Sequence, residues 1–316
     1  MACASGVALA QALAGCEWLG NTPVAIAAHI WPGYEPMFLA QTEGWLDASL
    51  VQLVEASSAT ESMQRLVTGG VQGAALTLDE VLKARAGGVP LSVVMVFDIS
   101  AGADMLLARA GIKNLADLKG RRVGVEQGAV GSLMLSHVLR DAKLTKHDIE
   151  PVAVTIDKQL DAWTRNQVDA VVTYEPVSSK LLQRGAVKLY DSRQIPDAIV
   201  DVLAVRSEAL DYRHATALRH LLAAYFRAHH HVHSNPHDAA YRMAGHLGLP
   251  EGDVLAAYQG LLLPDLASNR RLLSGRPPRL LTTARAVSAL MVEEGLLPRQ
   301  DTLTTLINAD YLPYAA

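Results

Sequence analysis

The amino-acid sequence predicts an α/β protein with two lobes, mixed and mainly parallel sheets, and a ligand cleft between the lobes. Between residues 24 and 206, short apolar runs alternate with amphipathic stretches, which is typical of strands connected by helices. After Ser207 the pattern changes to long helices alone. The chain has 316 residues and is 50% hydrophobic, enough for two cores, because a single core stops growing near ~250–300 residues.

Ten strands are predicted from apolar and β-branched runs that are bounded by turn-forming residues. They are 24–28, 51–56, 73–76, 91–97, 105–108, 122–126, 151–156, 170–174, 187–190 and 199–205. Residues 99–104 are small, have no helix or strand period, and are expected to form a loop.

Helices are predicted where apolar residues recur with a helical period, and Gly or Pro stands at most of their boundaries. Those between strands are 35–43, 60–68, 78–86, 114–118 and 160–166, and a further helix follows the loop at 128–132 and ends at 139. The later ones are 212–233, 236–247, 251–261 and 278–294.

The order of these elements predicts a discontinuous first lobe. Residues 22–98 and 199–316, which include the C-terminal helices, are expected to form lobe 1, and residues 99–198 to form lobe 2. The strand at 199–205 would return the chain to lobe 1. Two chain crossings would make a hinge with the cleft between the lobes.

The first 21 residues are expected to be an export signal or the remnant of a lipoprotein signal. They are small and mostly apolar, and Leu13-Ala-Gly-Cys16 resembles the lipobox of bacterial lipoproteins, in which the cysteine is lipidated. The positively charged residues that normally precede such a segment are missing, so a disordered Ala-rich tail is the alternative. No later run approaches the ~18 apolar residues of a membrane span.

Composition argues against several functions. The net charge is -4 and no basic run occurs, so nucleic acid is not expected as a partner. The two cysteines, Cys3 and Cys16, offer no disulfide framework and no Cys-x-x-Cys site. Because there is no Gly-x-Ser-x-Gly motif and no cysteine after Cys16, the sequence predicts neither an enzyme nor a cofactor.

The loop after the first strand carries the strongest binding signal. It holds Trp31, Tyr34 and Glu35 in a chain that is only 5% aromatic. Ligands of parallel sheets bind beyond the carboxyl ends of the strands, and aromatic faces can stack on a ligand or attract a cation. The alternative is that both rings pack under the following helix.

Other candidate ligand contacts follow later strands. They are Thr77, Asp79, Asp98, Ser100, Tyr174, Glu175 and Asp201, with Asp104 four residues beyond Ser100. Asp79 could instead cap a helix, Asp98 and Ser100 could serve a hinge or turn, and the later carboxylates could be buried and hydrogen-bonded. These alternatives stay open.

A glycine-containing loop joins a strand to a helix at Gly128, Ala129 and Val130. Backbone N–H groups at a helix N-terminus suit an anion or a carbonyl. The loop is neither Gly-x-Gly-x-x-Gly nor a Walker A sequence, so it implies no nucleotide. A plain turn with Ser132 as N-cap is the alternative.

The charge of the candidates favours one class of ligand. Acidic candidates dominate, and no Lys or Arg stands beside Glu35, Asp79, Asp98, Glu175 and Asp201. A simple oxyanion such as nitrate or a sulfonate would therefore be repelled. We therefore expect an amine, a zwitterion or a hydrogen-bond-donating N-heterocycle. A zwitterion could place its ammonium on a carboxylate and its own carboxylate at Gly128.

His229 and His233 are weak candidates for a metal site. They stand at i and i+4 on one helix, but no nearby Cys and no His-Glu-x-x-His motif supports them. The simpler interpretation is that these histidines stand near the C-terminus of a helix because a positive charge there interacts favourably with the helix dipole.

Several motifs in order carry a family resemblance over residues 24–206. They are Gly33-Tyr34 with Ala40 and Gly44, Gly69-Gly-Val-x-Gly73-Ala-Ala, Asp117-Leu-Lys-Gly120-Arg-Arg-Val-Gly-Val125, Gly128-x-x-Gly-Ser132, and Val168-Asp-Ala-Val171 before Glu175-Pro176. With these motifs the chain resembles the periplasmic substrate-binding proteins of ABC transporters, in the nitrate/sulfonate/taurine and thiamine-pyrimidine-precursor group.

This resemblance implies a type II periplasmic binding protein fold. It also implies a periplasmic monomer whose two lobes close over a small solute, like a Venus flytrap, and which then passes the solute to a permease. A lipid attached to Cys16 would be its contact with the membrane. A pyrimidine-precursor-synthesising enzyme of the same fold is the alternative, but the Cys-rich iron-binding segment and His/Lys pair of that branch are not found. A ligand-sensing module for a signalling partner is a third possibility.

Overall fold

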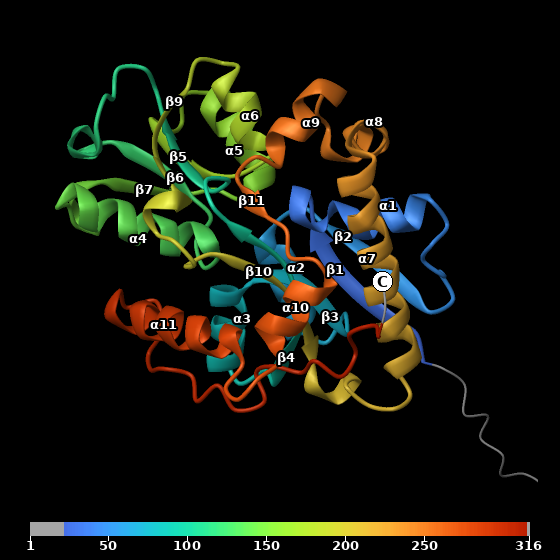
Figure 1. Cartoon of the computed structure of the whole chain (residues 1–316). Helices are drawn as coiled ribbons and strands as arrows, with labels where there is room; N and C mark the ends of the chain where they lie inside the picture. The colour runs from blue at the N-terminus through green and yellow to red at the C-terminus, as the bar shows by residue number, and fades with distance from the viewer. Residues whose placement is uncertain (1–21, 315–316) are drawn as a thin grey trace, which may run out of the picture.

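The computed structural model describes residues 22–314, which form two mixed sheets covered by helices (Figure 1). The first sheet has the order β11-β4-β10-β3-β1-β2 and the second the order β7-β6-β8-β5-β9. The strands of the first sheet are β1 Val24–His29, β2 Val51–Ala56, β3 Gly73–Thr77, β4 Leu91–Ser100, β10 Val200–Arg206 and β11 Leu261–Leu262. Those of the second are β5 Met105–Ala108, β6 Arg122–Val125, β7 Glu150–Ala153, β8 Ala170–Thr173 and β9 Val187–Asp191.

Most strands within each sheet share one direction. In the first sheet β1 is parallel to β2 and β3, and β10 lies antiparallel between β3 and β4. In the second sheet β6 is parallel to β7 and β8, and β5 lies antiparallel between β8 and β9. The reversed strands β5 and β10 each follow a passage of the chain from one sheet to the other, and the short β11 also runs antiparallel to β4. The predicted α/β architecture with two mixed sheets is confirmed.

Helices between strands cover both sheets, and the C-terminal helices surround the first. The former are α1 Glu35–Thr42, α2 Ala59–Val67, α3 Leu78–Ala86, α4 Val130–Ala142, α5 Ile156–Thr164 and α6 Val177–Leu182. The latter are α7 Ala215–Ser234, α8 Pro236–Leu247, α9 Glu251–Ala257, α10 Leu266–Leu273 and α11 Arg279–Glu293. Helix α7 packs on α1 and β2, whereas α10 packs on β4 and α11 on α3 (Figure 1). Within residues 22–314, no helix has the length and apolar character to cross a membrane.

The largest differences from the predicted elements arise where distant strands pair. The loop predicted at 99–104 is wrong in its first two residues, because β4 continues to Ser100. There Ile99 pairs with Val200 of β10, and Ser100 pairs with Leu261 of β11. The predicted helix 251–261 is likewise too long, since α9 ends at Ala257 and the chain then joins the sheet.

Two further boundaries differ around residue 155. The strand predicted to reach residue 156 ends at Ala153, and α5 starts at Ile156 rather than at residue 160. The Ile156 N–H donates to Glu126 Oε2 at 3.2 Å, which satisfies one of the free donors at the start of α5. Helices α6 and α10 were not predicted, and α7 starts at Ala215 instead of residue 212.

The proposed lobes can be located on this fold, although their boundaries stay a prediction. Residues 22–98 and 199–316 include the strands of the first sheet up to Asp98, together with β10 and β11. Residues 99–198 include every strand of the second sheet. The signal predicted at residues 1–21, with Cys16, lies outside the described residues.

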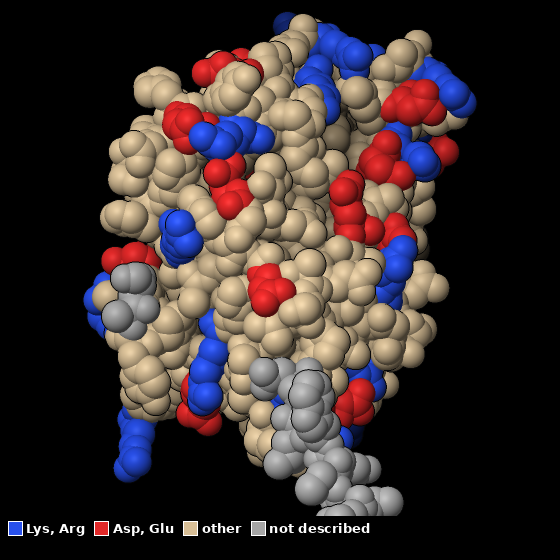
Figure 2. Space-filling view, turned by 90° about the vertical axis from the view of Figure 1, so that its right-hand side faces the viewer, with Lys and Arg blue, Asp and Glu red and all other residues tan. Residues whose placement is uncertain are grey.

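Figure 2 shows the side of the molecule that lies at the right of Figure 1. On this face basic and acidic side chains are interspersed among large uncharged areas. Phosphate backbones bind to clustered Lys and Arg, and this face has no continuous basic strip.

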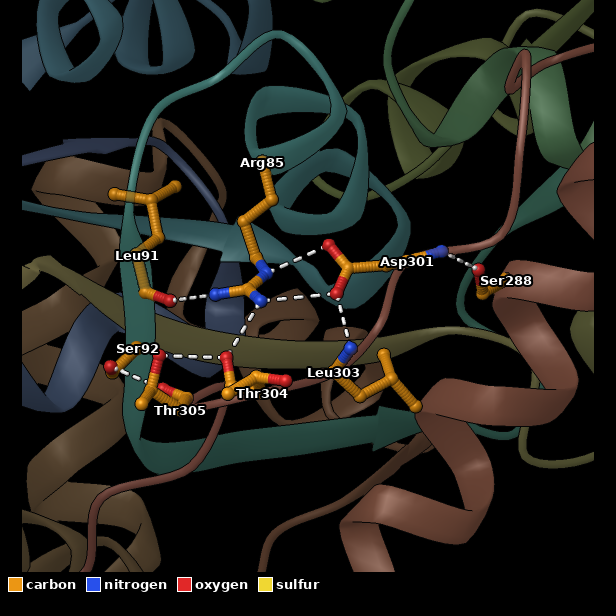
Figure 3. A network of polar contacts seen from close by, with 8 residues as sticks. All are labelled: Arg85, Leu91, Ser92, Ser288, Asp301, Leu303, Thr304 and Thr305. Carbon is orange, nitrogen blue, oxygen red and sulfur yellow. Dashed lines mark hydrogen bonds and ion pairs between the residues drawn. The ribbon is translucent and has the colours of Figure 1, made fainter.

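A buried ion pair attaches the C-terminal segment to α3 (Figure 3). Arg85 donates to Asp301 with Nε–Oδ2 at 2.9 Å and Nη2–Oδ1 at 3.0 Å, and it also donates to the carbonyls of Leu91 and Thr304. The Asp301 N–H donates to Ser288 of α11 at 2.9 Å. The Arg85 and Asp301 side chains are only 10% and 8% exposed. These contacts fix the C-terminal end of α3, whose N-terminal end reaches the candidate site.

Candidate functional site

A nearly closed pocket lies where the two sheets meet. Residues from both sheets and from α2, α3 and α4 surround it. The lining residues are His29, Trp31, Tyr34, Ala59, Thr77, Glu80, Asp104, Val130, Tyr174 and Asp201. The cavity inside it is about 10 Å³, roughly the space that one water molecule needs, so the pocket is nearly closed and a solute would need its walls to move apart.

Strand register places three polar residues side by side at one edge of the pocket. Asp201 of β10 pairs with Thr77 of β3 on one side and with Asp98 of β4 on the other. All three are buried. The antiparallel insertion of β10 therefore gathers polar residues that are far apart in the sequence.

Aromatic rings from both sheets form another part of the pocket. Trp31, after β1, and Tyr174, after β8, meet edge to face with ring centroids 5.3 Å apart. The Trp31 Nε1–H donates to Asp98 Oδ2 at 3.0 Å, and the Tyr34 hydroxyl donates to Asp201 Oδ1. These hydrogen bonds hold Trp31 and Tyr34 in fixed orientations.

Several buried polar atoms around the pocket have no hydrogen-bond partner. They include the Tyr174 hydroxyl, Asp104 Oδ2 and His29 Nδ1 in the lining, and Asp98 Oδ1 behind Trp31. Buried polar atoms are normally paired, because leaving one unpaired costs about 1–3 kcal/mol. A ligand in the pocket could supply the missing partners.

Burial shifts the pKa values of the ionisable groups in the direction of their neutral forms. It raises the pKa of Asp98 and that of Asp104 to about 7, and it lowers the pKa of His29 to about 3. The pKa of Glu80 is raised to about 8, first by burial and then by the charge of Asp79. Burial also raises the pKa of Asp201 well above its usual value. The imidazole is thus neutral at pH 7, and a bound cation would favour ionisation of the carboxyl groups.

The structure brings many of the predicted residues to this pocket. Trp31, Tyr34, Thr77, Val130, Tyr174 and Asp201 line it, as does Asp104. Asp98 reaches it through its bond to Trp31. Ser100 Oγ accepts the Asp104 N–H at 3.2 Å and bonds to Ser192, so it supports the backbone rather than the pocket surface. Asp79 is buried next to Glu80 but does not line the pocket.

Two of the predicted carboxylates point elsewhere. Glu35 accepts a hydrogen bond from His246 Nδ1 of α8 at 2.7 Å. Glu175 accepts from the Ser179 hydroxyl at 2.9 Å and from the Ser179 N–H at 3.3 Å, at the start of α6. Neither residue lines the pocket, because each satisfies a partner on a helix outside it.

The glycine-containing loop also differs from the prediction. Gly128 donates its N–H to Ser132 Oγ at 3.0 Å and accepts from Lys83 Nζ at 3.0 Å through its carbonyl. Ala129 is the N-cap of α4, and neither Gly128 nor Ala129 lines the pocket. The alternative of Ser132 as N-cap is also wrong, because Ser132 lies in the first turn of α4, where its Oγ accepts the Gly128 N–H. Val130 alone reaches the pocket from this loop.

Sequence reasoning missed His29, Glu80 and Ala59, which all line the pocket. His29 is the last residue of β1, a position that should have made it a candidate like Thr77 at the end of β3. Glu80 follows Thr77 in the Thr-x-x-Glu pattern of a capping box, which indicates a structural role. In the structure Glu80 both accepts the Thr77 N–H and lines the pocket.

His229 and His233 lie on α7, away from this pocket. Their ring centroids are 4.4 Å apart, and they line a groove with Asp265 and residues of α10. In the described part of the chain, no group of three or more His, Cys, Asp or Glu is arranged to hold a metal ion.

Replacing Glu35 with Gln should separate stability from binding. We expect the free energy of unfolding to fall by about 2 kcal/mol, because the charged hydrogen bond to His246 is lost. Ligand affinity should stay within about twofold of the wild type, since Glu35 does not line the pocket. Urea unfolding and calorimetric titration measure the two effects. A large loss of affinity at unchanged stability would place Glu35 in the binding site after all.

Comparisons with known proteins agree with this architecture. The family model described as NMT1/THI5 like matches residues 31–239. A relative in Escherichia coli (strain K12), named for the binding of aliphatic sulfonates, is 28% identical over 245 residues, which are 75% of this chain and 76% of that protein. A binding protein from Brucella abortus (strain 2308) is 25% identical over 135 residues, 36% of this chain and 42% of that protein.

Solved structures show the same fold. The alkanesulfonate-binding protein SsuA from Xanthomonas axonopodis pv. citri, bound to MOPS, has a TM-score of 0.75 at 18% identity, covering 89% of this chain and 96% of that one. The periplasmic aliphatic sulphonate binding protein SsuA from Escherichia coli has a TM-score of 0.71 at 22% identity, covering 90% and 98%. The desulfurization enzyme DSZB has a TM-score of 0.66 at 18% identity, covering 92% and 97%.

Proposed function

Because this chain belongs to the NMT1/THI5-like family, we propose that it is a solute-binding protein that captures one small molecule and delivers it to the permease of an ABC importer. The pocket between the sheets carries this proposal. Tyr174, Asp104 and His29 line it from both sheets with buried, unpartnered polar atoms. Such atoms are the preorganised hydrogen-bonding groups that a ligand site requires.

The lining favours an amine, a zwitterion or an N-heterocycle that donates hydrogen bonds. Glu80, Asp104 and Asp201 are its ionisable acids, and neither Lys nor Arg lines the pocket. A sulfonate, the ligand class named for the relatives, offers only acceptor oxygens, so it cannot donate a hydrogen bond to these carboxyl groups, and each of them that is ionised repels it. A zwitterion would place its ammonium among these carboxyl groups.

The cellular setting is part of the proposal. A relative described as periplasmic supports a place in the periplasm, and an importer's permease is the partner that the solute-binding role requires. We further propose a monomer whose two lobes, 22–98 with 199–316 and 99–198, move about the β4–β5 and β9–β10 connections. A lipid on Cys16 would be its membrane contact.

An enzyme of the same fold is the second candidate, favoured by the likeness to the desulfurization enzyme DSZB. Residues 22–314 contain no cysteine, so a covalent mechanism would need another nucleophile. Binding without turnover separates a carrier or a ligand-sensing module from this enzyme.

Calorimetric titration against amines, betaines, pyrimidines and sulfonates tests the proposal. We expect saturable one-to-one binding of an amine or N-heterocycle, with the ligand recovered unchanged. For a cationic ligand, affinity should rise about tenfold from pH 6 to pH 8, because the pKa of Asp104 is raised to about 7 and the cation binds its ionised form. Turnover of the ligand, or a sulfonate that binds more tightly than every amine and heterocycle, would contradict the proposal.

A further inference from the structure

The carboxyl group of Glu80 connects the first turns of two helices at the pocket. Its Oε1 accepts the Val130 N–H at 3.1 Å, and its Oε2 accepts the Thr77 N–H at 3.0 Å. Val130 is the first residue of α4, which covers the second sheet, and Thr77 is the N-cap of α3 on the first sheet. Glu80 thus uses both oxygens as acceptors across the junction of the two sheets.

The N-terminus of a long helix is where an anion would normally bind. Its free N–H groups and the positive end of the helix dipole stabilise a negative group there. In α4, which has 13 residues, the Val130 N–H is taken by Glu80 and the preceding Gly128 N–H by Ser132. The nearby Lys83 amine is bonded to the Gly128 carbonyl at 3.0 Å, so this cation is engaged as well.

The same pocket contains polar atoms that still lack partners. Tyr174 and Asp104 are 6% and 4% exposed, and the Tyr174 hydroxyl and Asp104 Oδ2 have no hydrogen-bond partner. Both residues line the pocket with Glu80 and Val130. The pocket therefore combines a filled anion position with open hydrogen-bonding positions.

We propose that Glu80 determines the specificity of this pocket by occupying, with its own carboxyl group, the position at α4 where an anionic group of a ligand would bind. The pocket then excludes sulfonates and takes ligands that bring a positive charge or hydrogen-bond donors to Asp104 and Asp201. This inference rests on the proposed function for the identity of the site, but it concerns one residue and one class of ligand.

Two variants, Glu80→Ala and Glu80→Gln, test this role with methanesulfonate as the probe. Glu80→Ala frees the Val130 N–H and the space of the carboxyl group, whereas Glu80→Gln keeps the size of the side chain but replaces one of the two acceptor oxygens with an NH2 group. We expect Glu80→Ala to bind methanesulfonate at least tenfold more tightly than the wild type by calorimetric titration, with a smaller gain for Glu80→Gln. If Glu80→Ala does not fold, as judged by circular dichroism, Glu80→Gln alone decides the question.

Glu126→Gln is the matched control. Glu126 also accepts N–H groups at two helix starts, from Thr60 at 2.9 Å and from Ile156 at 3.2 Å, but it does not line the pocket. It should bind methanesulfonate as weakly as the wild type does. An equal gain in Glu126→Gln would mean that any loosened contact between the sheets admits the anion, and the inference would be wrong.

The outcomes for Glu80 and for the proposed function can be told apart. Folded Glu80 variants that bind methanesulfonate no better than the wild type overturn the role of Glu80, even when the wild type binds an amine. A gain of methanesulfonate binding supports that role, even when the wild type binds no compound of the wider panel and the solute-binding proposal fails.

Discussion

Replacing Asp104 with Asn is expected to weaken the binding of an amine-bearing ligand by about 100-fold. Asp104 lies between β4 and β5, lines the pocket, and has an unpartnered Oδ2. Removing one partner of a buried, hydrogen-bonded charge pair costs about 2–5 kcal/mol, and each 1.4 kcal/mol is tenfold in affinity. Calorimetric titration of the wild type and the variant with the best ligand of the panel measures the loss.

Asp161→Asn is the matched control for Asp104. It removes the same charge from an exposed helix position whose ion pair with Arg165 is open to solvent. Exposed pairs contribute only ~0–1 kcal/mol, so ligand affinity should not change. Equal affinities of Asp104→Asn and the wild type would exclude Asp104 from the binding contacts.

The free energy of unfolding should fall by several kcal/mol between pH 5 and pH 8. Burial raises the pKa of Asp98 and that of Asp104 to about 7, and the pKa of Glu80 to about 8. Between the unfolded and the folded pKa, the native state holds protons that the unfolded chain has released, so each rise in pH destabilises the fold. A single group contributes at most about 1.4 kcal/mol per pH unit, and the three groups together account for the expected size.

The pH window matters for this measurement. The pKa values of Glu61 and Asp191 are lowered to about 2 by hydrogen bonds, so their contribution is lost only below the pH range of the experiment. The raised pKa of His246, caused first by its hydrogen bond to Glu35, acts in the same direction as the pocket carboxyl groups. The pKa values of His29 and His229, lowered by burial to about 3 and about 4, act in the opposite direction below about pH 6.5 and offset part of the fall. Urea unfolding at pH 5, 6.5 and 8 gives the slope.

Asp104→Asn should make this slope less steep, because it removes one of the titrating groups. Saturation with a cationic ligand should do the same, since the cation favours the ionised carboxylates in the native state. A free energy of unfolding that is constant or increases from pH 5 to pH 8 would show that the buried carboxyl groups do not retain their protons.

The sequence predicts local elements well where the signal is itself local. Val51–Ala56 and Leu78–Ala86 match the predicted bounds, because β-branched runs and flanking glycines act within a few residues. The short strand Leu261–Leu262 was missed because its partner, β4, is more than 150 residues away. Nothing in the two leucines themselves distinguishes a strand from the end of a helix.

In the candidate site, too, the sequence predicts the residues whose signal is local but not those that depend on distant contacts. Residues at strand ends, such as Trp31 and Tyr174, could be proposed because ligand sites follow the carboxyl ends of strands. Which carboxylate faces the pocket could not be predicted. Glu35 and Glu80 both lie in the first turn of a helix, but only Glu35 meets a histidine from α8. That contact joins residues 211 positions apart, so it depends on tertiary packing alone.

The ion pair between Arg85 and Asp301 has a practical consequence for attaching the protein to a sensor chip. Tyr314 is 93% exposed, so a peptide tag fused beyond it would project into solvent without disturbing a packed side chain. A chain shortened before Asp301 would instead leave the Arg85 guanidinium without its counter-ion, on the helix that carries Glu80 of the pocket lining. Attachment through the C-terminal end therefore leaves the Arg85–Asp301 pair intact, whereas removal of Asp301 would break it.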